Sequence, residues 1–256
     1  MQVDFGKTAD DYARHRAGFP DRFFARLFEA GFVRLDDRVL DLGTGTGTVA
    51  RGLVKRGCKV TGLDPSKPLL DMARRLDQEE GIKTAYINAK AEETGAPAQN
   101  FDVVTAGQCW HWFDRSRAAA EAMRILVPGG RLIIAYFDWL PLPGNAVEAT
   151  EQLILAHNPD WRMGGGTGIY PKWFADLSTT GFLEIESFSF DLAVLYSHEA
   201  WLGRIRASAG IGASLSPDAV AAFNTAHAQL LSTKFPENPL SIPHRVFAVT
   251  GRTAPS

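Results

Sequence analysis

The 256-residue sequence is poor in cysteine and has no long hydrophobic run. Its two cysteines, Cys58 and Cys109, lie far apart and match neither a disulfide framework nor the spacing of a zinc site. No apolar segment approaches the length that spans a membrane, and the polar N-terminus lacks the apolar core of a signal peptide. These absences predict a cytoplasmic protein without a metal site, a disulfide scaffold or a membrane partner.

An excess of charge of either sign is also missing, because 27 basic and 29 acidic side chains give a formal net charge of −2. This balance does not favour a polyanion, so nucleic acid is not an expected partner. The motifs H-E-x-x-H and G-x-S-x-G are absent. The run GGGTG at 164–168 lacks the lysine of a phosphate-binding loop and is predicted to be a connection.

The first half of the chain alternates short apolar runs with segments of helical period. Strands are predicted at 38–43, 59–64, 84–89, 101–107 and 128–137, and helices at 48–57, 67–81 and 116–126. Gly57 stops the first of these helices, Pro65 and Ser66 begin the second, and Asp114 caps the third. This alternation predicts an α/β fold with a doubly wound, mostly parallel sheet.

Beyond Phe137 the alternation stops. We expect a helix at 171–182 that ends at Gly181, a strand at 183–195, helical residues at 198–236 and a last strand at 245–252. The chain is therefore expected to form one domain over residues 1–256, with a core at about 33–137, 171–197 and 244–252. Insertions at about 138–170 and 198–236 are expected to form a helical cap.

Three glycines at alternate positions, Gly43, Gly45 and Gly47, follow the first strand. Glycine accepts positive φ and carries no side chain, so a ligand can approach the backbone closely. Asp64 ends the second strand 19 residues after Gly45, where a carboxylate can accept hydrogen bonds from both hydroxyls of a ribose. Because the dinucleotide pattern G-x-G-x-x-G is broken, with the third glycine one residue early, a nucleoside is favoured over a dinucleotide. Asp41 suits a cationic amino group better than a phosphate.

The combination of DLGTGTG and GLDPS resembles the class I S-adenosylmethionine-dependent methyltransferases. The segments FDVVTAGQCWHWFD and AAAEAMRILVPGGRLII resemble the fourth and fifth strands of that family, closest to methyltransferase type 11 and to the trans-aconitate-methyltransferase-like group. The resemblance covers roughly residues 5–137. It implies a seven-stranded, Rossmann-like methyltransferase fold, S-adenosylmethionine as cofactor and a small-molecule methyl acceptor.

The resemblance also implies a set of cofactor-binding residues. The glycine loop would hold the methionine end, Asp41 the amino group and Asp64 the ribose. Lysine stands at position 90, where the family has an acid, so another group must accept from the adenine amino group, and Glu92 is the candidate. The full set is Asp41, Gly43, Thr44, Gly45, Gly47, Asp64, Pro65, Ala91, Glu92, Gln108 and Trp110.

Candidate acceptor-side residues follow the fourth strand and occur in two other segments. His111 is the candidate general base, with a role in hydrogen bonding the loop as the alternative. The tryptophans at 110 and 112 either line the site beside the cofactor or cap the core. The predicted substrate pocket comprises Tyr12, Arg16, Trp112, Arg204 and Arg206, where the arginines could bind a carboxylate or simply be solvated.

The function predicted from these motifs is methyl transfer to a small organic acceptor. O- or C-methylation is favoured over nucleobase methylation, because the N-P-P-Y or D-P-P-Y run of nitrogen methyltransferases is absent after the fourth strand. One alternative is an NAD(P)-dependent oxidoreductase, disfavoured by the early third glycine and the lack of a Y-x-x-x-K pair. The other is a nucleoside-binding module without catalysis, which is not excluded because Lys90 stands where the family has an acid.

Overall fold

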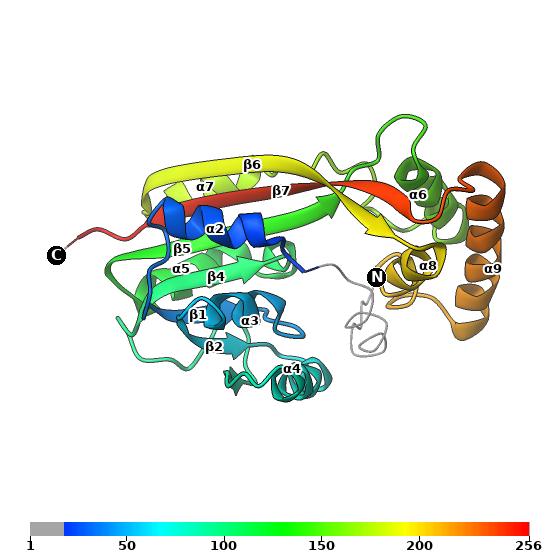
Figure 1. Ribbon diagram of the computed structural model, residues 1–256. Coiled ribbons are helices and arrows are strands. Elements are labelled where there is room, and N and C mark those ends of the chain that lie inside the picture. Colours follow the sequence, from blue (N-terminus) through cyan, green and yellow to red (C-terminus); the bar gives the residue numbers. More distant parts are fainter. Residues whose placement is uncertain (1–17, 256) are drawn as a thin grey trace. The chain divides into compact units, whose positions relative to one another are not determined.

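The structure, a computed structural model, describes residues 18–255 (Figure 1). These residues divide into two compact units. The sheet unit comprises residues 18–137, 170–190 and 246–255, and the helical unit comprises residues 138–169 and 191–245. The insertions expected at 138–170 and 198–236 fall, except for residue 170, within the helical unit.

The sheet has seven strands in the order β3-β2-β1-β4-β5-β7-β6. Strands β3, β2, β1, β4 and β5 pair in parallel, in agreement with the alternation of strands and helices in the sequence. The bounds are β1 Arg38–Leu42, β2 Lys59–Leu63, β3 Ala85–Ile87, β4 Phe101–Gly107, β5 Leu126–Trp139, β6 Leu183–Tyr196 and β7 Leu240–Arg252. The predicted doubly wound α/β fold is confirmed.

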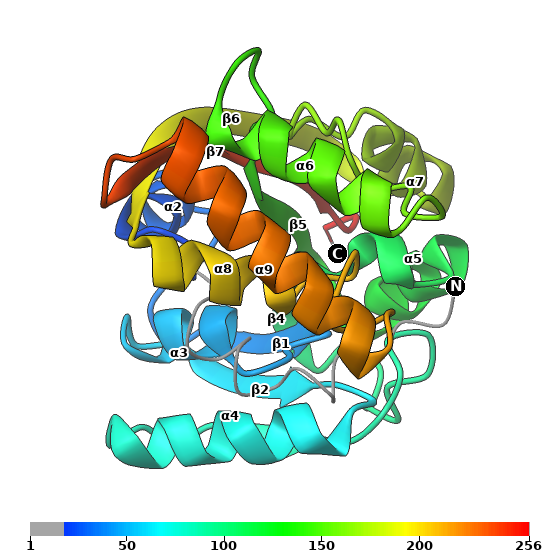
Figure 2. The ribbon, with the colours of Figure 1, turned by 90° about the vertical axis from the view of Figure 1, so that its right-hand side faces the viewer.

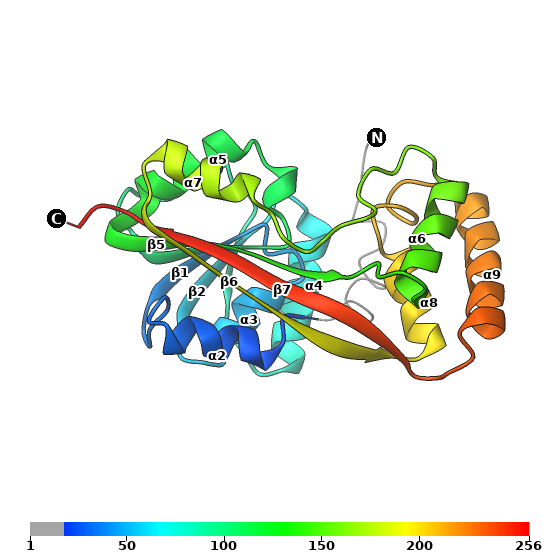
Figure 3. The same cartoon turned by 90° about the horizontal axis from the view of Figure 1, so that it is seen from above.

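Helices cover both faces of the sheet, with α5 and α7 on one face and α2 and α3 on the other (Figure 3). The helices of the sheet unit are α2 Asp21–Glu29, α3 Thr48–Val54, α4 Lys67–Glu79, α5 Arg115–Ile125 and α7 Lys172–Thr180. Asp114 caps α5 by accepting from the backbone of Arg117, and Gly181 ends α7 at φ 98°, both as predicted. Between β3 and β4, residues 88–100 contain no helix.

The helical unit contains α6 Ala146–His157, α8 His198–Arg206 and α9 Pro217–Lys234. Helix α9 packs against both α6 and α8 (Figure 2). Their contact surface is apolar and includes Trp201 and Phe223, which are almost completely buried. Within residues 18–255, the structure has no helix with the length and apolarity required to cross a bilayer.

A buried histidine lies in the core of the helical unit. His227 has no exposed surface, and its Nε2 atom lies 3.1 Å from Thr150 Oγ1. The Thr150 hydroxyl donates its proton to Ala146 O and accepts from Trp201 Nε1, so His227 must donate through Nε2. Burial lowers the pKa of His227 to about 4, because the charged imidazolium is poorly solvated there.

We predict that this histidine makes the fold sensitive to acid. Its pKa falls from 6.5 in the unfolded chain to about 4 in the folded protein, so the unfolded state binds more protons between these values. The free energy of unfolding therefore decreases as the pH falls through this window, by roughly 2–4 kcal/mol for this one group. Urea unfolding at a series of pH values from 7 to 4.5 should show a weaker pH dependence in His227→Phe than in the wild type. Equal pH dependence would contradict the assignment.

Candidate active site

The loop between β1 and α3 provides the backbone of the site. Gly43, Gly45 and Gly47 have φ values of 58°, 56° and 80°, the left-handed region that favours glycine. The loop follows the carboxyl end of β1, which in an open parallel sheet is the edge where ligands bind. Gly43 is half-buried and Gly45 and Gly47 are buried, so the close approach of a ligand to this backbone stays a prediction.

Asp41, in β1, lies beneath the loop and is only 1% exposed. Its carboxylate accepts from Thr44 Oγ1 at 2.6 Å and from Thr105 Oγ1 at 2.7 Å. Burial raises the pKa of Asp41 to about 6, although both hydroxyl donors act in the opposite direction. Asp41 therefore fixes the loop through its hydrogen bond with Thr44. It also places beneath the loop a carboxylate whose pKa is about 6.

Asp64 follows β2 and connects two backbone segments. Its Oδ2 accepts from Gly45 N at 3.0 Å, and its Oδ1 accepts from Ser66 N at 2.8 Å. Pro65, between Asp64 and Ser66, is exposed. An ionised carboxylate has about four acceptor positions, so about two remain for a ligand. The structure thus brings Asp41, Thr44, Gly45 and Asp64 together, as the sequence predicts.

The segment after β3 lies beside Asp64. Asn88 Nδ2 donates to Asp64 O at 2.9 Å, and Ala91 is 2% exposed. Glu92 Oε1 accepts from Asp114 N at 2.8 Å, so this carboxylate caps the start of α5. Lys90 is exposed and forms a single antiparallel bridge with Glu93. Asn88 was not singled out in the sequence, although its position directly after a strand was a usable signal.

His111 belongs to η2, a short 3-10 helix over Trp110–Trp112 that follows β4. Tyr136 Oη lies 2.6 Å from its Nδ1 atom and 3.1 Å from its Nε2 atom. Tyr136, in β5, is 6% exposed and packs against the rings of Tyr170 and Trp173, which stack on each other at 4.1 Å. Tyr136 was not predicted from the sequence, because nothing in a strand pattern identifies a hydrogen-bond partner 25 residues away.

Three other predicted residues flank His111. The Trp110 side chain has no exposed surface, and its Nε1 donates to Asp176 Oδ2 at 3.0 Å, so it packs in the core. Gln108 has a φ of 61° and donates its backbone N–H to Ala135 O at 2.8 Å. Trp112 is 43% exposed.

The remaining predicted pocket residues lie elsewhere in the chain. In the helical unit, the Arg204 guanidinium carbon lies 4.6 Å from the centre of the Trp139 ring, a cation–π contact. Arg206 Nη1 donates to Asn224 Oδ1 at 3.0 Å. Tyr12 and Arg16 lie outside the residues that the structure describes.

Comparisons with known proteins agree with this geometry. Residues 40–134 match the family profile described as a methyltransferase domain. An uncharacterized methyltransferase of Mycobacterium tuberculosis is 37% identical over 132 residues, 52% of this chain and 51% of that protein. This chain therefore spans about half the length of that curated relative.

Two solved structures share the fold. A putative type II methyltransferase from Anaeromyxobacter dehalogenans superposes with a TM-score of 0.65 and 25% identity, covering 94% of this chain and 99% of that one. The Haemonchus contortus phosphoethanolamine N-methyltransferase 2, in complex with S-adenosyl-L-methionine, has a TM-score of 0.55 and 18% identity, covering 98% and 56%.

The glycine loop, the acid after β2 and the seven-stranded sheet thus occur in a chain whose central part matches a methyltransferase domain. This match favours a methyltransferase over the NAD(P)-dependent oxidoreductase that the sequence left as an alternative. Residues 40–134 match a type 11 methyltransferase domain, a domain of the class I S-adenosylmethionine-dependent kind, and the sheet that contains them has the fold of the methyltransferase structures.

Proposed function

We propose that this protein transfers a methyl group from S-adenosylmethionine to a small organic acceptor. The observation that carries the proposal is the convergence of two buried carboxylates, Asp41 and Asp64, on a loop of left-handed glycines at the end of β1. A site with two carboxylates and bare backbone suits a ligand with an ammonium group and a ribose better than a pyrophosphate.

The residues present fit the cofactor. About two acceptor positions of Asp64 remain for the ribose hydroxyls, and the loop from Gly43 to Gly47 offers backbone to the methionine end. When bound, the cofactor supplies a methyl group on a sulfonium, which an acceptor takes up by in-line displacement. The protein's part is to align the acceptor and to exclude water.

Asp41 is proposed to attract the ammonium group of the methionine moiety. Its carboxylate is buried, and the hydroxyls of Thr44 and Thr105 that donate to it are neutral, so a cationic ligand would stabilise its charge further. This role makes cofactor affinity depend on the ionisation of Asp41.

At the adenine side, Ala91 is proposed to contact the ring through its backbone, and Asn88 fixes the segment by its bond to Asp64 O. Glu92 already accepts from Asp114 N, so as an adenine ligand it would use a remaining acceptor position. Gln108 stays a proposed cofactor contact, whereas the packing of Trp110 accounts for that residue without a ligand.

On the acceptor side, we favour O- or C-methylation. His111 is proposed as the general base for a hydroxyl acceptor, with Tyr136 as its hydrogen-bond partner. A carboxylate or enolate acceptor needs little base catalysis. In that case, Arg204 or Arg206 is proposed to bind the anion. Tyr12, Arg16 and Trp112 stay sequence predictions as acceptor-side residues.

The proposal is tested by calorimetry with S-adenosylmethionine, S-adenosylhomocysteine and NAD, followed by a labelled-methyl assay on a panel of small carboxylates, phenols and amines. We expect binding of the first two ligands, no binding of NAD, and transfer of label to one class of acceptor. Binding without transfer to any acceptor would favour the nucleoside-binding module that lacks catalysis.

We predict that Asp64→Ala weakens the binding of S-adenosylhomocysteine by roughly 10- to 100-fold, because the ribose loses a charged acceptor. Asp71→Ala is the matched control, because Asp71 forms an exposed ion pair with Arg74 on α4. Calorimetry should show unchanged affinity in the control. Wild-type affinity in a folded Asp64→Ala protein would place the ribose elsewhere.

We predict that the affinity for S-adenosylhomocysteine falls as the pH drops from 7 to 5. The pKa of Asp41 is about 6, so acid neutralises its charge, while the ammonium of the ligand stays protonated. The dissociation constant should rise by up to about tenfold per pH unit below the pKa, since binding favours the ionised form. Asp41→Asn should bind more weakly and lose most of this pH dependence. If the variant kept the full dependence, another group would be responsible.

For a hydroxyl acceptor identified in the panel, we predict that His111→Gln lowers the methyl-transfer rate by roughly 10²- to 10⁴-fold, the usual contribution of a general base. Cofactor affinity should change little. Turnover by this variant at close to the wild-type rate would leave His111 as part of the pocket wall.

A further inference from the structure

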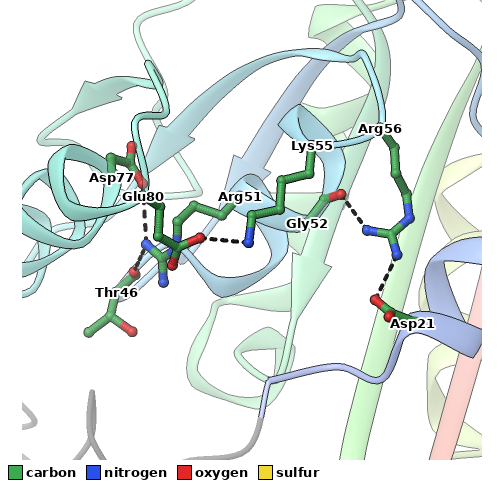
Figure 4. A network of polar contacts seen from close by, with 8 residues as sticks. All are labelled: Asp21, Thr46, Arg51, Gly52, Lys55, Arg56, Asp77 and Glu80. Carbon is green, nitrogen blue, oxygen red and sulfur yellow. Dashed lines mark hydrogen bonds and ion pairs between the residues drawn. The ribbon is translucent and has the colours of Figure 1, made fainter.

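Behind the glycine loop lies a buried network that the proposed chemistry does not use. Arg51, in α3, donates from Nη1 to Thr46 O at 2.6 Å (Figure 4). The other end of the same peptide group, Gly47 N–H, donates to Thr44 O at 2.8 Å. The peptide between Thr46 and Gly47 is therefore held at both ends and cannot rotate without breaking two hydrogen bonds.

Carboxylates on α4 balance the charge of Arg51. Its side chain is 9% exposed, and Nη1 lies 3.3 Å from Asp77 Oδ1, itself on a side chain that is 5% exposed. Glu80, directly after α4, bridges Arg51 of α3 and Lys55 directly after α3, since its carboxylate lies 3.3 Å from Arg51 Nε and 2.6 Å from Lys55 Nζ (Figure 4). A buried cation with partners on a second helix fixes α3 and α4 to each other at this point.

Strand β3 joins the same network through Tyr86, whose Oη donates to Asp77 Oδ2 at 2.9 Å. A Cβ atom on Gly47 would lie 2.6 Å from this Oη and 2.9 Å from Arg51 Nη1. Glycine is thus required at position 47 by its φ of 80° and also by the network packed behind it.

We infer that Arg51, together with Asp77 and Tyr86, positions the cofactor loop and couples it to β3. This inference rests on the proposed function. The loop faces the methionine end of the cofactor, and β3 leads into the adenine-side segment that contains Asn88 and Ala91. One buried network therefore sets the distance between the two ends of the cofactor site. None of the three side chains needs to touch the ligand, so they are positioning residues.

Arginine is specifically suited to this role. Its Nη1 donates to Thr46 O and to Asp77, and its Nε pairs with Glu80. Nη1 and Nε are separate donors in one rigid, planar guanidinium group. A lysine at position 51 keeps the positive charge, but a single ammonium on a flexible stem does not hold the loop carbonyl and both carboxylates in the same geometry.

The test compares Arg51→Lys and Tyr86→Phe with Lys55→Gln. Lys55 is the matched control, because it directly follows the same helix and its Nζ pairs with Glu80 rather than with the loop carbonyl of Thr46. Calorimetry with S-adenosylhomocysteine should give a dissociation constant at least about tenfold higher for Arg51→Lys, about threefold higher for Tyr86→Phe and within about twofold of the wild type for Lys55→Gln.

Each titration is run at a temperature where circular dichroism shows the variant to be folded. Variants that melt at lower temperature but bind like the wild type would show a purely structural role and overturn the inference. If Arg51→Lys does not fold, the dissociation constant of folded Tyr86→Phe is compared with that of the wild type, and equal values overturn the inference.

Amide exchange of Gly47 provides a readout that needs no ligand. Exchange should be faster in folded Arg51→Lys than in the wild type and unchanged in Lys55→Gln. Unchanged exchange in Arg51→Lys would overturn the anchoring of the loop. A wild-type protein that does not bind S-adenosylhomocysteine would instead overturn the proposed function, while the exchange measurement still decides on the anchoring.

Discussion

The hydrogen bond from Gly45 N–H to the carboxylate of Asp64 is the contact on which the site depends. It joins the loop after β1 to the end of β2. The bond is possible because the two strands are parallel and in register, with Leu42 opposite Leu63, so both end at the same edge of the sheet. The same carboxylate is the proposed ribose acceptor, and the fold therefore sets the distance between the glycine loop and the ribose.

Burial explains the chemistry of this edge. Asp41, Thr44 and Thr105 are all buried, and a carboxylate in such a place is costly unless it is hydrogen bonded. Two threonine hydroxyls offset part of this cost, and desolvation by burial still raises the pKa of Asp41. A cationic ligand group lowers this cost further, which gives the site a preference for the ionic form of an amino acid moiety.

The local features of the fold were predictable because they depend on neighbours in sequence. Asp114 at the start of α5 and Gly181 at the end of α7 have the roles that their residue types favour. Helix α2 was not predicted, because it lies before the alternating pattern. The helical cap expected at 138–170 contains α6, but the bounds of this helix were not predicted, because the segment has a mixed composition. Residues 88–100 connect two strands without the helix that a regular βα repeat would place there.

The site was predictable where a motif joins consecutive residues, as in the glycine loop and Asp64. It was not predictable where side chains meet across the fold. Tyr136 reaches His111 from the next strand, and Asp77 reaches Arg51 from the next helix. From the sequence, Trp110 could face either the ligand or the core, because neither its complete burial nor its hydrogen bond to Asp176 is visible in a motif.

The central claim is that S-adenosylmethionine binds at this loop. A ¹H–¹⁵N NMR titration of the wild-type protein with S-adenosylhomocysteine tests it most directly, because it locates the ligand on the chain. The account predicts saturable shifts of the amides of Gly45, Gly47 and Ser66, and none with NAD. Saturable binding that leaves these three amides unshifted would contradict it.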